Sequence, residues 1–361
     1  MLTTESPAPV RIGSVELTSP LAVAPMAGMT DTAFRRLVKR HGGCGLVVTE
    51  MVSSEGLVRG IDRTLEYAEF TGEERPVSIQ IFGGDPDRMA EAARIVEGMG
   101  ADIVDVNMGC PVPKIAKHNA GCSLMREPEH AAGVIAAMAR AVKIPVTVKM
   151  RAGWNDADRN APTLARMVED AGAAAVSVHG RTAAQSYGGV ADWDLVAEVA
   201  DRLTIPVFGS GDCVEPQQIV DKLRMGVEGV LVGRGVLRNP WVLAQAADLA
   251  AGRPAREVTP ADRARFLLEY IDLLMHERVR DDDNGRRDAG VPPSGTPPAA
   301  DERHGRWVVN KVRALGAYFT KGLDNGSHLR TAINSAGSLP ALRATIETFF
   351  LGSPAHSSLL R

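Results

Sequence analysis

A repeated alternation of apolar and amphipathic segments restricts most strongly how this chain can fold. Between about residue 20 and residue 235, eight short apolar runs are separated mostly by stretches with helical patterning. The expected strands are Leu21–Pro25, Leu46–Glu50, Val77–Phe82, Ile103–Asn107, Val146–Lys149, Ala175–His179, Val207–Gly209 and Gly229–Val232. Apolar runs of this length, bounded by turn residues, are typical of strands in a parallel sheet that is buried on both faces.

Helical segments fill most of the intervals between these runs. They are expected at Thr32–Arg40, Pro86–Met99, Pro128–Ala141, Ala161–Ala171 and Pro216–Leu223. Eight strand–helix units in roughly 230 residues are typical of a (β/α)8 TIM barrel. The alternative is a doubly wound open sheet, which usually carries a GxGxxG motif after its first strand. The sequence lacks that motif, so it favours the barrel.

The character of the chain changes after Trp241. Further helices are expected at Thr259–Arg278, from Trp307 onward, at Leu329–Ala336 and at Pro340–Leu351. Asp281–Gly305 is polar, rich in Pro and Gly and almost free of large apolar residues, so we expect a disordered insertion there. The sequence therefore predicts an α/β barrel domain over residues 1–250 and a small helical domain over residues 251–361.

Composition and charge exclude several classes of protein. The 361 residues are 45% hydrophobic and 24% charged, which is ordinary for a globular chain. The four cysteines form no CxxC pair and no zinc-type cluster, so we expect reduced thiols and no metal. No apolar run approaches the roughly 18 residues of a membrane span, and the N-terminus lacks a signal-peptide pattern. We therefore expect a cytoplasmic protein, and we expect it to be a monomer.

The loop after the fourth expected strand carries the most specific signal. Gly109-Cys110-Pro111 forms a turn just beyond the strand's C-terminal end, where parallel α/β proteins place their chemistry. Most cysteines are small buried hydrophobic residues. The flanking glycine and proline instead shape a loop, so Cys110 is a candidate catalytic residue.

Polar and small residues also stand at or just beyond the C-terminal ends of the strands, which share one mouth in a barrel. These residues are Pro25, Met26, Ala27, Gln80, Asn107, Lys149, His179, Arg181, Ser210, Gly211, Asp212, Gly233 and Arg234. Barrels often bind phosphate with the loops after strands 7 and 8, where glycine permits close approach and arginine offers paired donors. Structural alternatives are a Lys149 paired with a carboxylate and a His179 whose hydrogen bonds are satisfied in the core.

The motif Asn107-x-Gly109-Cys110-Pro111, followed by Ala120-Gly121, resembles the signature of the tRNA-dihydrouridine synthases (Dus), most closely their bacterial B-type branch. The segment from Pro25 to Asp31 is similar to the family's N-terminal flavin motif. Ser210-Gly211-Asp212 departs from the Asn-Gly-Asp that is common in bacterial members, which puts the Ser210 side-chain contact in doubt. The insertion Asp281–Gly305 departs from compact bacterial members.

The resemblance implies an FMN enzyme that uses NADPH or NADH to reduce the uracil C5=C6 bond of uridines in the D-loop region of tRNA. Cys110 would protonate C5 after hydride arrives at C6. The implied FMN contacts are Pro25, Met26, Ala27, Gln80, Lys149, His179, Ser210, Gly211, Asp212, Gly233 and Arg234. Lys149 would lie near the N1/O2 edge of the flavin, and Asn107 and Arg181 would contact the substrate.

The C-terminal region carries a local excess of positive charge, although the net charge of the chain is −3. Six Lys/Arg stand against the single acid Asp324: Arg303, Arg306, Lys311, Arg313, Lys321 and Arg330. Trp307, Tyr318 and Phe319 are interleaved with them. The segment is either a solvated helix face or a surface for the phosphate backbone and bases of tRNA.

Two other functions compete with the synthase. An FMN-dependent oxidoreductase of the dihydroorotate or dihydropyrimidine type would act on a small molecule and needs no basic, aromatic tail. A tRNA-binding protein with a vestigial flavin site would not need an intact Cys110 and Lys149. The sequence leaves open which uridine is reduced, and it contains no motif that separates NADPH from NADH.

Overall fold

The computed structural model describes residues 9–112, 115, 119–276 and 302–352. The chain divides into two compact units, Met1–Arg256 and Glu257–Arg361.

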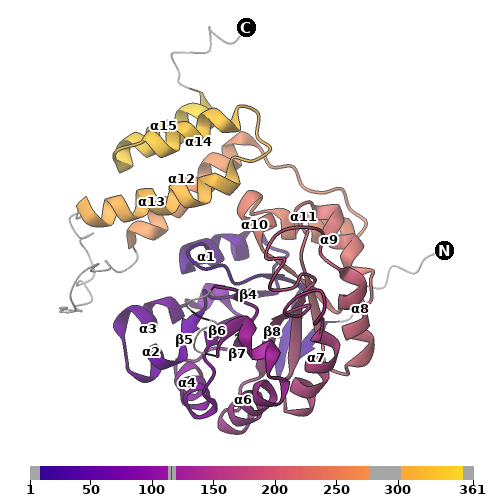
Figure 1. Ribbon diagram of the computed structural model, residues 1–361. Coiled ribbons are helices and arrows are strands. Elements are labelled where there is room, and N and C mark those ends of the chain that lie inside the picture. Colours follow the sequence, from indigo (N-terminus) through magenta and orange to yellow (C-terminus); the bar gives the residue numbers. More distant parts are fainter. Residues whose placement is uncertain (1–8, 113–114, 116–118, 277–301, 353–361) are drawn as a thin grey trace. The chain divides into compact units, whose positions relative to one another are not determined.

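The first unit is a closed barrel of eight parallel strands (Figure 1). The strands are β3 (Leu21–Val23), β4 (Leu46–Val48), β6 (Val77–Phe82), β7 (Ile103–Met108), β8 (Val146–Arg151), β9 (Ala175–His179), β10 (Val207–Ser210) and β11 (Gly229–Val232). Strand β11 pairs with β3, and β4 pairs with β6, so the ring closes without a free edge. A two-residue strand, β5 (Val52–Ser53), extends the pairing beside β6. The predicted (β/α)8 barrel is confirmed.

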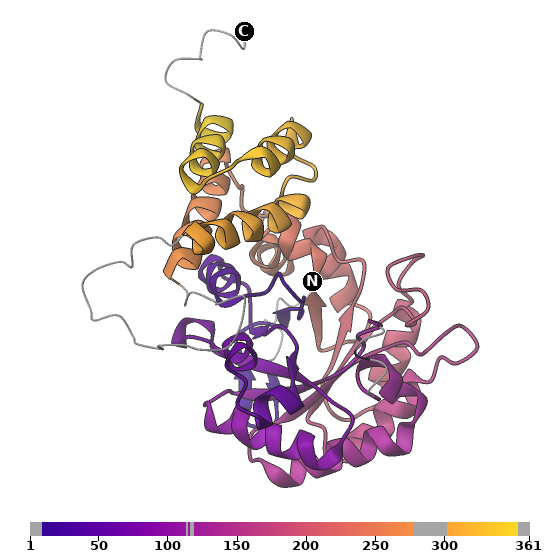
Figure 2. The same cartoon turned by 60° about the vertical axis from the view of Figure 1, so that its left-hand side comes forward.

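Helices surround the strands of this unit (Figure 2). They are α1 (Thr32–His41), α2 (Ser54–Val58), α3 (Asp62–Ala68), α4 (Pro86–Gly98), α6 (Pro128–Ala141), α7 (Ala161–Asp170), α8 (Trp193–Arg202), α9 (Pro216–Leu223), α10 (Arg234–Arg238) and α11 (Val242–Ala250), with 3-10 turns η1 (Gly72–Glu74) and η2 (Gly121–Arg126). Asp31, Asp85 and Asp192 accept the N-capping hydrogen bonds of α1, α4 and α8. Acidic caps thus fix where these three helices begin, and α4 also has a proline in its first turn.

An N-terminal hairpin fills the end of the barrel interior that lies away from the strand C-termini. Strands β1 (Val10–Ile12) and β2 (Val15–Leu17) pair antiparallel across a turn at Gly13, whose φ is +56°. Ile12 and Leu17 are almost fully buried and belong to one apolar cluster with interior residues of the barrel strands, including Leu46, Ile103 and Phe208. The sequence analysis did not predict this hairpin, because each strand has only three residues.

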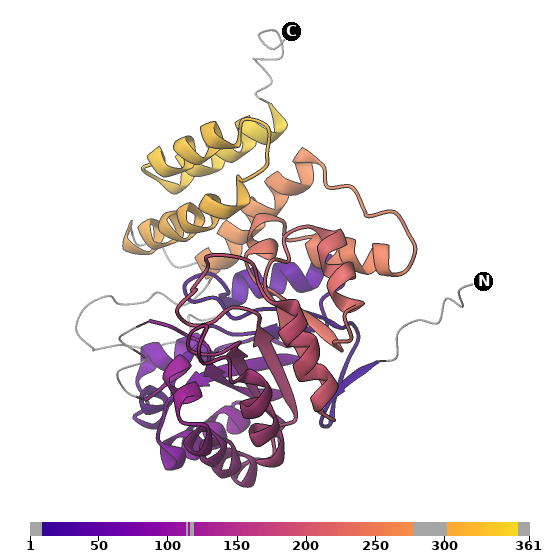
Figure 3. The ribbon, with the colours of Figure 1, turned by 45° about the vertical axis from the view of Figure 1, so that its right-hand side comes forward.

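The second unit is a bundle of four helices, coloured orange to yellow in Figure 3. They are α12 (Pro260–His276), α13 (Glu302–Phe319), α14 (Gly326–Ser335) and α15 (Leu339–Leu351). The rings of Phe266 and Phe319 stack at 5.7 Å in its core. Residues 281–301 of the predicted insertion lie outside the described residues, whereas its last residues, 302–305, already belong to α13. Among the helices described, none has the length and apolar character needed to cross a membrane.

Candidate active site

Polar side chains concentrate in the half of the barrel interior nearest the strand C-termini. The register of neighbouring strands sets Gln80 against Asp105, Asp105 against Thr147, and Asn107 against Lys149. Because side chains alternate along a strand, residues two apart point to the same face. The interior therefore changes from the apolar cluster around the hairpin to a layer of hydrogen-bonding groups below the mouth.

A continuous chain of hydrogen bonds runs from this layer to the Cys110 loop. Thr147 Oγ1 donates to Asp105 Oδ1 at 2.6 Å, and Gln80 Nε2 donates to Asp105 Oδ2 at 2.7 Å. Asn107 Nδ2 donates to Gln80 Oε1 at 2.7 Å. The Cys110 backbone N–H donates to Asn107 Oδ1 at 2.9 Å. We call these four bonds the Asp105–Cys110 relay.

Cys110 is the one thiol of the chain that is partly exposed. Cys44, Cys122 and Cys213 are buried, and burial raises the pKa of Cys44 to about 11 and that of Cys213 to about 12. Thiols with such raised pKa values are poor proton donors and poor nucleophiles at neutral pH. Access to solvent and a place beyond β7 make Cys110 the best candidate among the four cysteines for a reactive thiol.

Arg151 fastens the Cys110 loop to the loop that follows β9. Its Nε donates to the carbonyl of Gly109 at 2.7 Å. Its terminal nitrogen donates to the carbonyls of Thr182 and Ser186 at 3.0 and 2.9 Å. The Cys110 loop is therefore held by two side chains: Asn107 accepts from the backbone N–H of Cys110, and Arg151 donates to the carbonyl of Gly109.

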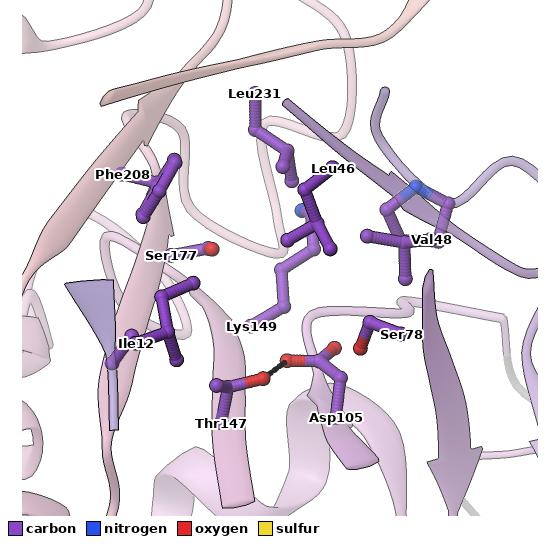
Figure 4. Close-up of a pocket in the computed structure, with 12 residues that line it drawn as sticks. Ile12, Leu46, Val48, Ser78, Asp105, Thr147, Lys149, Ser177, Phe208 and Leu231 are labelled. Carbon is purple, nitrogen blue, oxygen red and sulfur yellow. Dashed lines mark hydrogen bonds between the residues drawn. The ribbon is translucent and has the colours of Figure 1, made fainter. Parts of the chain in front are cut away.

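Lys149 projects into the interior beside Asp105 and Thr147 (Figure 4). These residues, with Ser177, line a small cavity of about 20 Å³. Burial, followed by the charge of Arg151, lowers the pKa of Lys149 to about 8, although Asp105 and Cys110 act in the opposite direction. Burial also raises the pKa of Asp105, against the effect of its two hydrogen-bond donors and Lys149. Lys149 is therefore mostly protonated at neutral pH, because its pKa lies only about one unit higher.

His179 is a neutral ring at the end of β9, next to the loop after β10. Burial, together with Lys149, Arg151, Arg181 and Arg234, lowers its pKa to about 2. The backbone N–H of Arg181 donates to Nδ1 at 3.3 Å, which assigns the ring proton to Nε2. A Cβ placed on Gly211 would lie 3.6 Å from Nε2, so this donor stands beside the loop after β10.

Arg181 and Asp212 form a clamp between two loops. Arg181 is 2% exposed, and it donates to Asp212 Oδ1 at 2.7 Å and to the carbonyls of Gly188 and Gly189. Asp212 also accepts from the backbone N–H of Ala191 at 2.7 Å, and these contacts lower its pKa despite partial burial. The predicted substrate contact of Arg181 and cofactor contact of Asp212 stay predictions, since both side chains serve here to order the loops.

Arg234 and Arg151 flank an exposed aromatic ring at the mouth. The guanidinium of Arg234 lies 5.1 Å from the ring centroid of Tyr187, and that of Arg151 lies 6.0 Å from it. Tyr187 is 62% exposed. Arg234 in this position has donors available for an anionic group, because a cation–π contact uses the face of the guanidinium and not its N–H edge.

The loop after β3 is built on buried polar contacts. The backbone N–H of Met26 donates to Thr30 Oγ1 at 3.0 Å, and that of Gly28 donates to Glu50 Oε2 at 2.7 Å. A Cβ on Gly233 would lie 3.6 Å from Met26 Sδ, so the loops after β3 and β11 stand next to each other. Pro25 lines the same small cavity as Lys149. The segment Pro25–Ala27 therefore lies close to the interior polar layer.

The structure brings most of the predicted residues to one end of the barrel, and it adds residues that the sequence analysis missed. Asp105 accepts from the predicted residue Gln80, and Thr147 in turn donates to Asp105. Arg151 and Glu50 hold the loops that carry Cys110 and Met26, through Gly109 and Gly28. Asp105, Thr147 and Arg151 stand two positions from predicted residues, so strand alternation was the available signal. Among the described residues, no group of three or more His, Cys, Asp and Glu side chains could hold a metal ion.

The barrel and its polar mouth define an enzyme of the (β/α)8 class, with its reactive groups at the C-terminal ends of the strands. The chain belongs to the dihydrouridine synthase (Dus) family, whose model matches residues 22–286.

Known relatives extend this similarity over most of the chain. A probable tRNA-dihydrouridine synthase of Rickettsia conorii is 35% identical over 344 residues, which are 94% of this chain and 96% of the relative. A tRNA-dihydrouridine synthase B of Xanthomonas campestris pv. campestris is 42% identical over 267 residues, 73% of this chain and 80% of the relative. A 2-naphthoyl-CoA reductase in complex with 2-naphthoyl-CoA superposes with a TM-score of 0.50 at 14% identity, over 68% of this chain and 52% of the reductase. That likeness shows a shared fold.

Proposed function

We propose that this protein is a tRNA-dihydrouridine synthase that reduces the uracil C5=C6 bond of uridines in the D-loop region of tRNA, with FMN as cofactor and NADPH or NADH as electron donor. The observation that carries the proposal is the partly exposed Cys110, held at the mouth of the barrel near a protonated Lys149. Membership in the Dus family and relatives named for this activity support it.

The donors at the mouth fit an anionic flavin nucleotide. Four cations, Lys149, Arg151, Arg181 and Arg234, act on the neutral ring of His179. One buried nitrogen of Arg181 has no hydrogen-bond partner among the described residues. A phosphate and a ring that becomes anionic on reduction match this excess of positive charge. When bound, FMN supplies the hydride that adds to C6.

The residues that would hold FMN come from the C-terminal parts of six strands and the loops after them. They are Pro25, Met26, Ala27, Gln80, Lys149, His179, Ser210, Gly211, Asp212, Gly233 and Arg234. The neutral His179 offers its Nε2–H as a donor, and Arg234 offers the free edge of its guanidinium to the phosphate. Ser210 is 5% exposed and its carbonyl accepts from Gly180, so its contribution would be mainly through its backbone. Asp212 would act by ordering the loop through Arg181.

The protein's own groups then move one proton and balance one charge. The thiol of Cys110, which is partly exposed on its loop, gives its proton to C5 as a general acid. The ammonium of Lys149 stabilises the negative charge that develops on the uracil oxygens. Both polar ends of the Asn107 side chain are engaged in the relay, so Asn107 would contribute by holding the loop and not as the main substrate donor.

The helical unit would bind the tRNA body. Arg306 and Lys321 are exposed, and Lys311 lies over the ring of Trp307 at 5.7 Å. A uridine must leave its stack to reach the mouth of a barrel, so the surrounding RNA needs a separate grip. Positive side chains and aromatic rings on one helix suit that task.

The test compares wild-type protein with Cys110→Ala on unmodified tRNA and NADPH, with dihydrouridine mapped by mass spectrometry. We expect Cys110→Ala to lower dihydrouridine formation by about 10²- to 10⁴-fold, as loss of a general acid does, while the flavin stays bound. Cys44→Ala is the matched control, because Cys44 is buried with its thiol on the Leu46 carbonyl, and it should stay active.

The same assay separates the competing functions. A wild-type protein that binds flavin and reduces a free pyrimidine, but leaves tRNA unchanged, would replace the proposal with a small-molecule oxidoreductase. A protein that binds tRNA but neither retains flavin nor forms dihydrouridine would be a binding protein. Mapping dihydrouridine in tRNA from the source organism with and without the gene would name the target uridine.

A further inference from the structure

The Asp105–Cys110 relay depends on the orientation of two side-chain amides. Gln80 and Asn107 each carry an acceptor oxygen and a donor nitrogen, and either amide could turn by 180° without changing its shape. Only one combination gives a donor and an acceptor at every contact. Something at the ends of the relay must select it.

The upper end of the relay is fixed by the backbone. The N–H groups of Cys110 and Gly109 can only donate, and both point to Asn107 Oδ1, at 2.9 and 3.2 Å. Asn107 must therefore present its oxygen to the loop and its nitrogen to Gln80. This orientation is useful only if Gln80 offers an oxygen in return.

The lower end is fixed by Asp105. An ionised carboxylate only accepts, so it draws the nitrogen of Gln80 toward itself and turns the Gln80 oxygen toward Asn107. The hydroxyl of Thr147 donates to the other carboxylate oxygen from the next strand. Asp105 is 5% exposed and sits opposite both partners in register, so water has little access to replace it.

We infer that Asp105 is a positioning residue: as an acceptor-only group it orients Gln80 and Asn107, and through them it holds the backbone of Cys110 in place. Asp105 bonds to neither Cys110 nor the mouth, and it acts across two intervening amides. The consequence for uracil reduction rests on the proposed function, whereas the consequence for the loop does not.

Three variants separate the hydrogen bonds of Asp105 from its charge and from general damage to the core. Asp105→Val removes the acceptors at a similar volume in a β-branched residue that suits a strand. Asp105→Asn keeps the relay, because its oxygen can accept from Gln80 while its nitrogen donates to the Thr147 hydroxyl. Ser78→Ala is the control, since Ser78 is buried in the same cavity on β6 and its hydroxyl has no partner among the described residues.

Hydrogen exchange of the loop amides tests the inference without any assumption about substrate. In the full-length holoenzyme at pH 6.5, we expect Asp105→Val to speed exchange of the Gly109 and Cys110 amides by at least about tenfold, the loss of roughly one hydrogen bond. Asp105→Asn and Ser78→Ala should stay within about threefold of wild type. Unchanged exchange in Asp105→Val would overturn the inference.

A second break in the relay covers the case in which Asp105→Val does not fold. Gln80→Met has a similar length and shape but neither donates nor accepts strongly. It should expose the same two amides by a similar factor while leaving strands β9 and β10 protected. Full protection of Cys110 in Gln80→Met would show that the loop is held without the relay.

The functional readout is the rate of each half-reaction. Asp105→Val should slow oxidation of the reduced enzyme by unmodified tRNA at least about tenfold at saturating tRNA, with KM for tRNA and the rate of flavin reduction by NADPH within about threefold. Asp105→Asn should restore the first rate. Equal loss of both rates, or loss of flavin, would mean that Asp105 is only structural. If tRNA does not oxidise the reduced wild-type enzyme, the proposed function is refuted. The hydrogen-exchange result would still show whether Asp105 holds the Cys110 loop.

Discussion

At the scale of single residues, the site is governed by a balance of charge around Lys149. Burial and Arg151 lower its pKa to about 8, and Asp105 and Cys110 limit that fall. Burial, followed by the same cation with Arg151, Arg181 and Arg234, lowers the pKa of His179 and keeps its ring neutral. Lys149 therefore supplies the charge and His179 an uncharged donor, a division of roles that comes from position in the barrel and not from residue type.

This balance predicts how activity depends on pH. If the ammonium of Lys149 stabilises the developing charge on uracil, dihydrouridine formation should fall as pH rises through about 8, because the protonated form exists below the pKa. Asp105→Asn removes a charge that raises this pKa, so the alkaline limb should move to lower pH. The measurement is the rate at saturating tRNA and NADPH from pH 6 to pH 10.

Lys149→Arg is the control for this profile. Arginine keeps its proton throughout the range, so the limb near pH 8 should disappear while the overall rate falls. An unchanged limb in both variants would assign the titration to another group. For Asp105→Asn we thus expect two separate results: amide exchange in the Cys110 loop stays as in wild type, and the alkaline limb of the pH profile moves to lower pH.

The site residues that could be predicted from the sequence share one physical property. Cys110, Lys149 and His179 stand at or just beyond the ends of apolar runs, and parallel strands bring such ends together. Asp105 lies inside its apolar run. A single polar residue among Ile103, Val104 and Val106 does not indicate which side chain it will hydrogen-bond. The hydrogen bonds of Asn107 and Arg181 depend on register and loop path, which no local pattern contains.

At the scale of elements, a buried ion pair fastens α1 to the 3-10 turn η1 that precedes β6. Arg35 and Glu74 are 1% and 0% exposed and meet at 2.5 Å. Arg35 also donates to the carbonyls of Thr30 and Glu69 at 2.7 and 2.8 Å. Since Thr30 also bonds Met26, this arginine supports the segment proposed to lie against the flavin.

Removing one member of this pair should be costly. Arg35→Leu leaves Glu74 buried without its charge partner, and we expect it to lower the free energy of unfolding by about 3–5 kcal/mol. Arg36→Leu, on the same helix, removes a more exposed pair with Glu73 and should cost less than about 1 kcal/mol. Urea denaturation of both variants checks the difference, and equal stability would show that the ion pair contributes little.

Strand and helix positions were predicted best where periodicity was strong. β6, β9, β11, α6 and α9 have the bounds expected from the sequence. The hairpin β1–β2 and β5 were missed because two- and three-residue strands carry too few alternations to stand out. Apolar and polar residues do alternate in VRIGSVEL. Only the structure shows that Ile12 and Leu17 are buried in the barrel interior, which explains this alternation.

At the scale of the whole molecule, charge is divided unevenly along the chain. The net charge of −3 opposes binding to a polyanion, so any grip on tRNA must come from a local surface. Helix α13 and the turn after it carry Arg306, Lys311 and Lys321, with Lys321 over the ring of Tyr318 at 5.2 Å. This helix is thus the best candidate for contact with the phosphate backbone.

Replacing Arg306, Lys311 and Lys321 together by Gln tests that assignment. Each phosphate contact that is lost should reduce the slope of log K against log salt by about 1, so tRNA binding weakens and becomes less dependent on salt. The matched control replaces Arg94, Arg140 and Lys143, three exposed cations in or next to the barrel helices α4 and α6, and loses the same charge. If both triple variants weaken binding equally, overall charge and not α13 would govern affinity. If only the α13 variant does so, while flavin reduction by NADPH stays at the wild-type rate in both, RNA binding and redox chemistry reside in separate units of the chain.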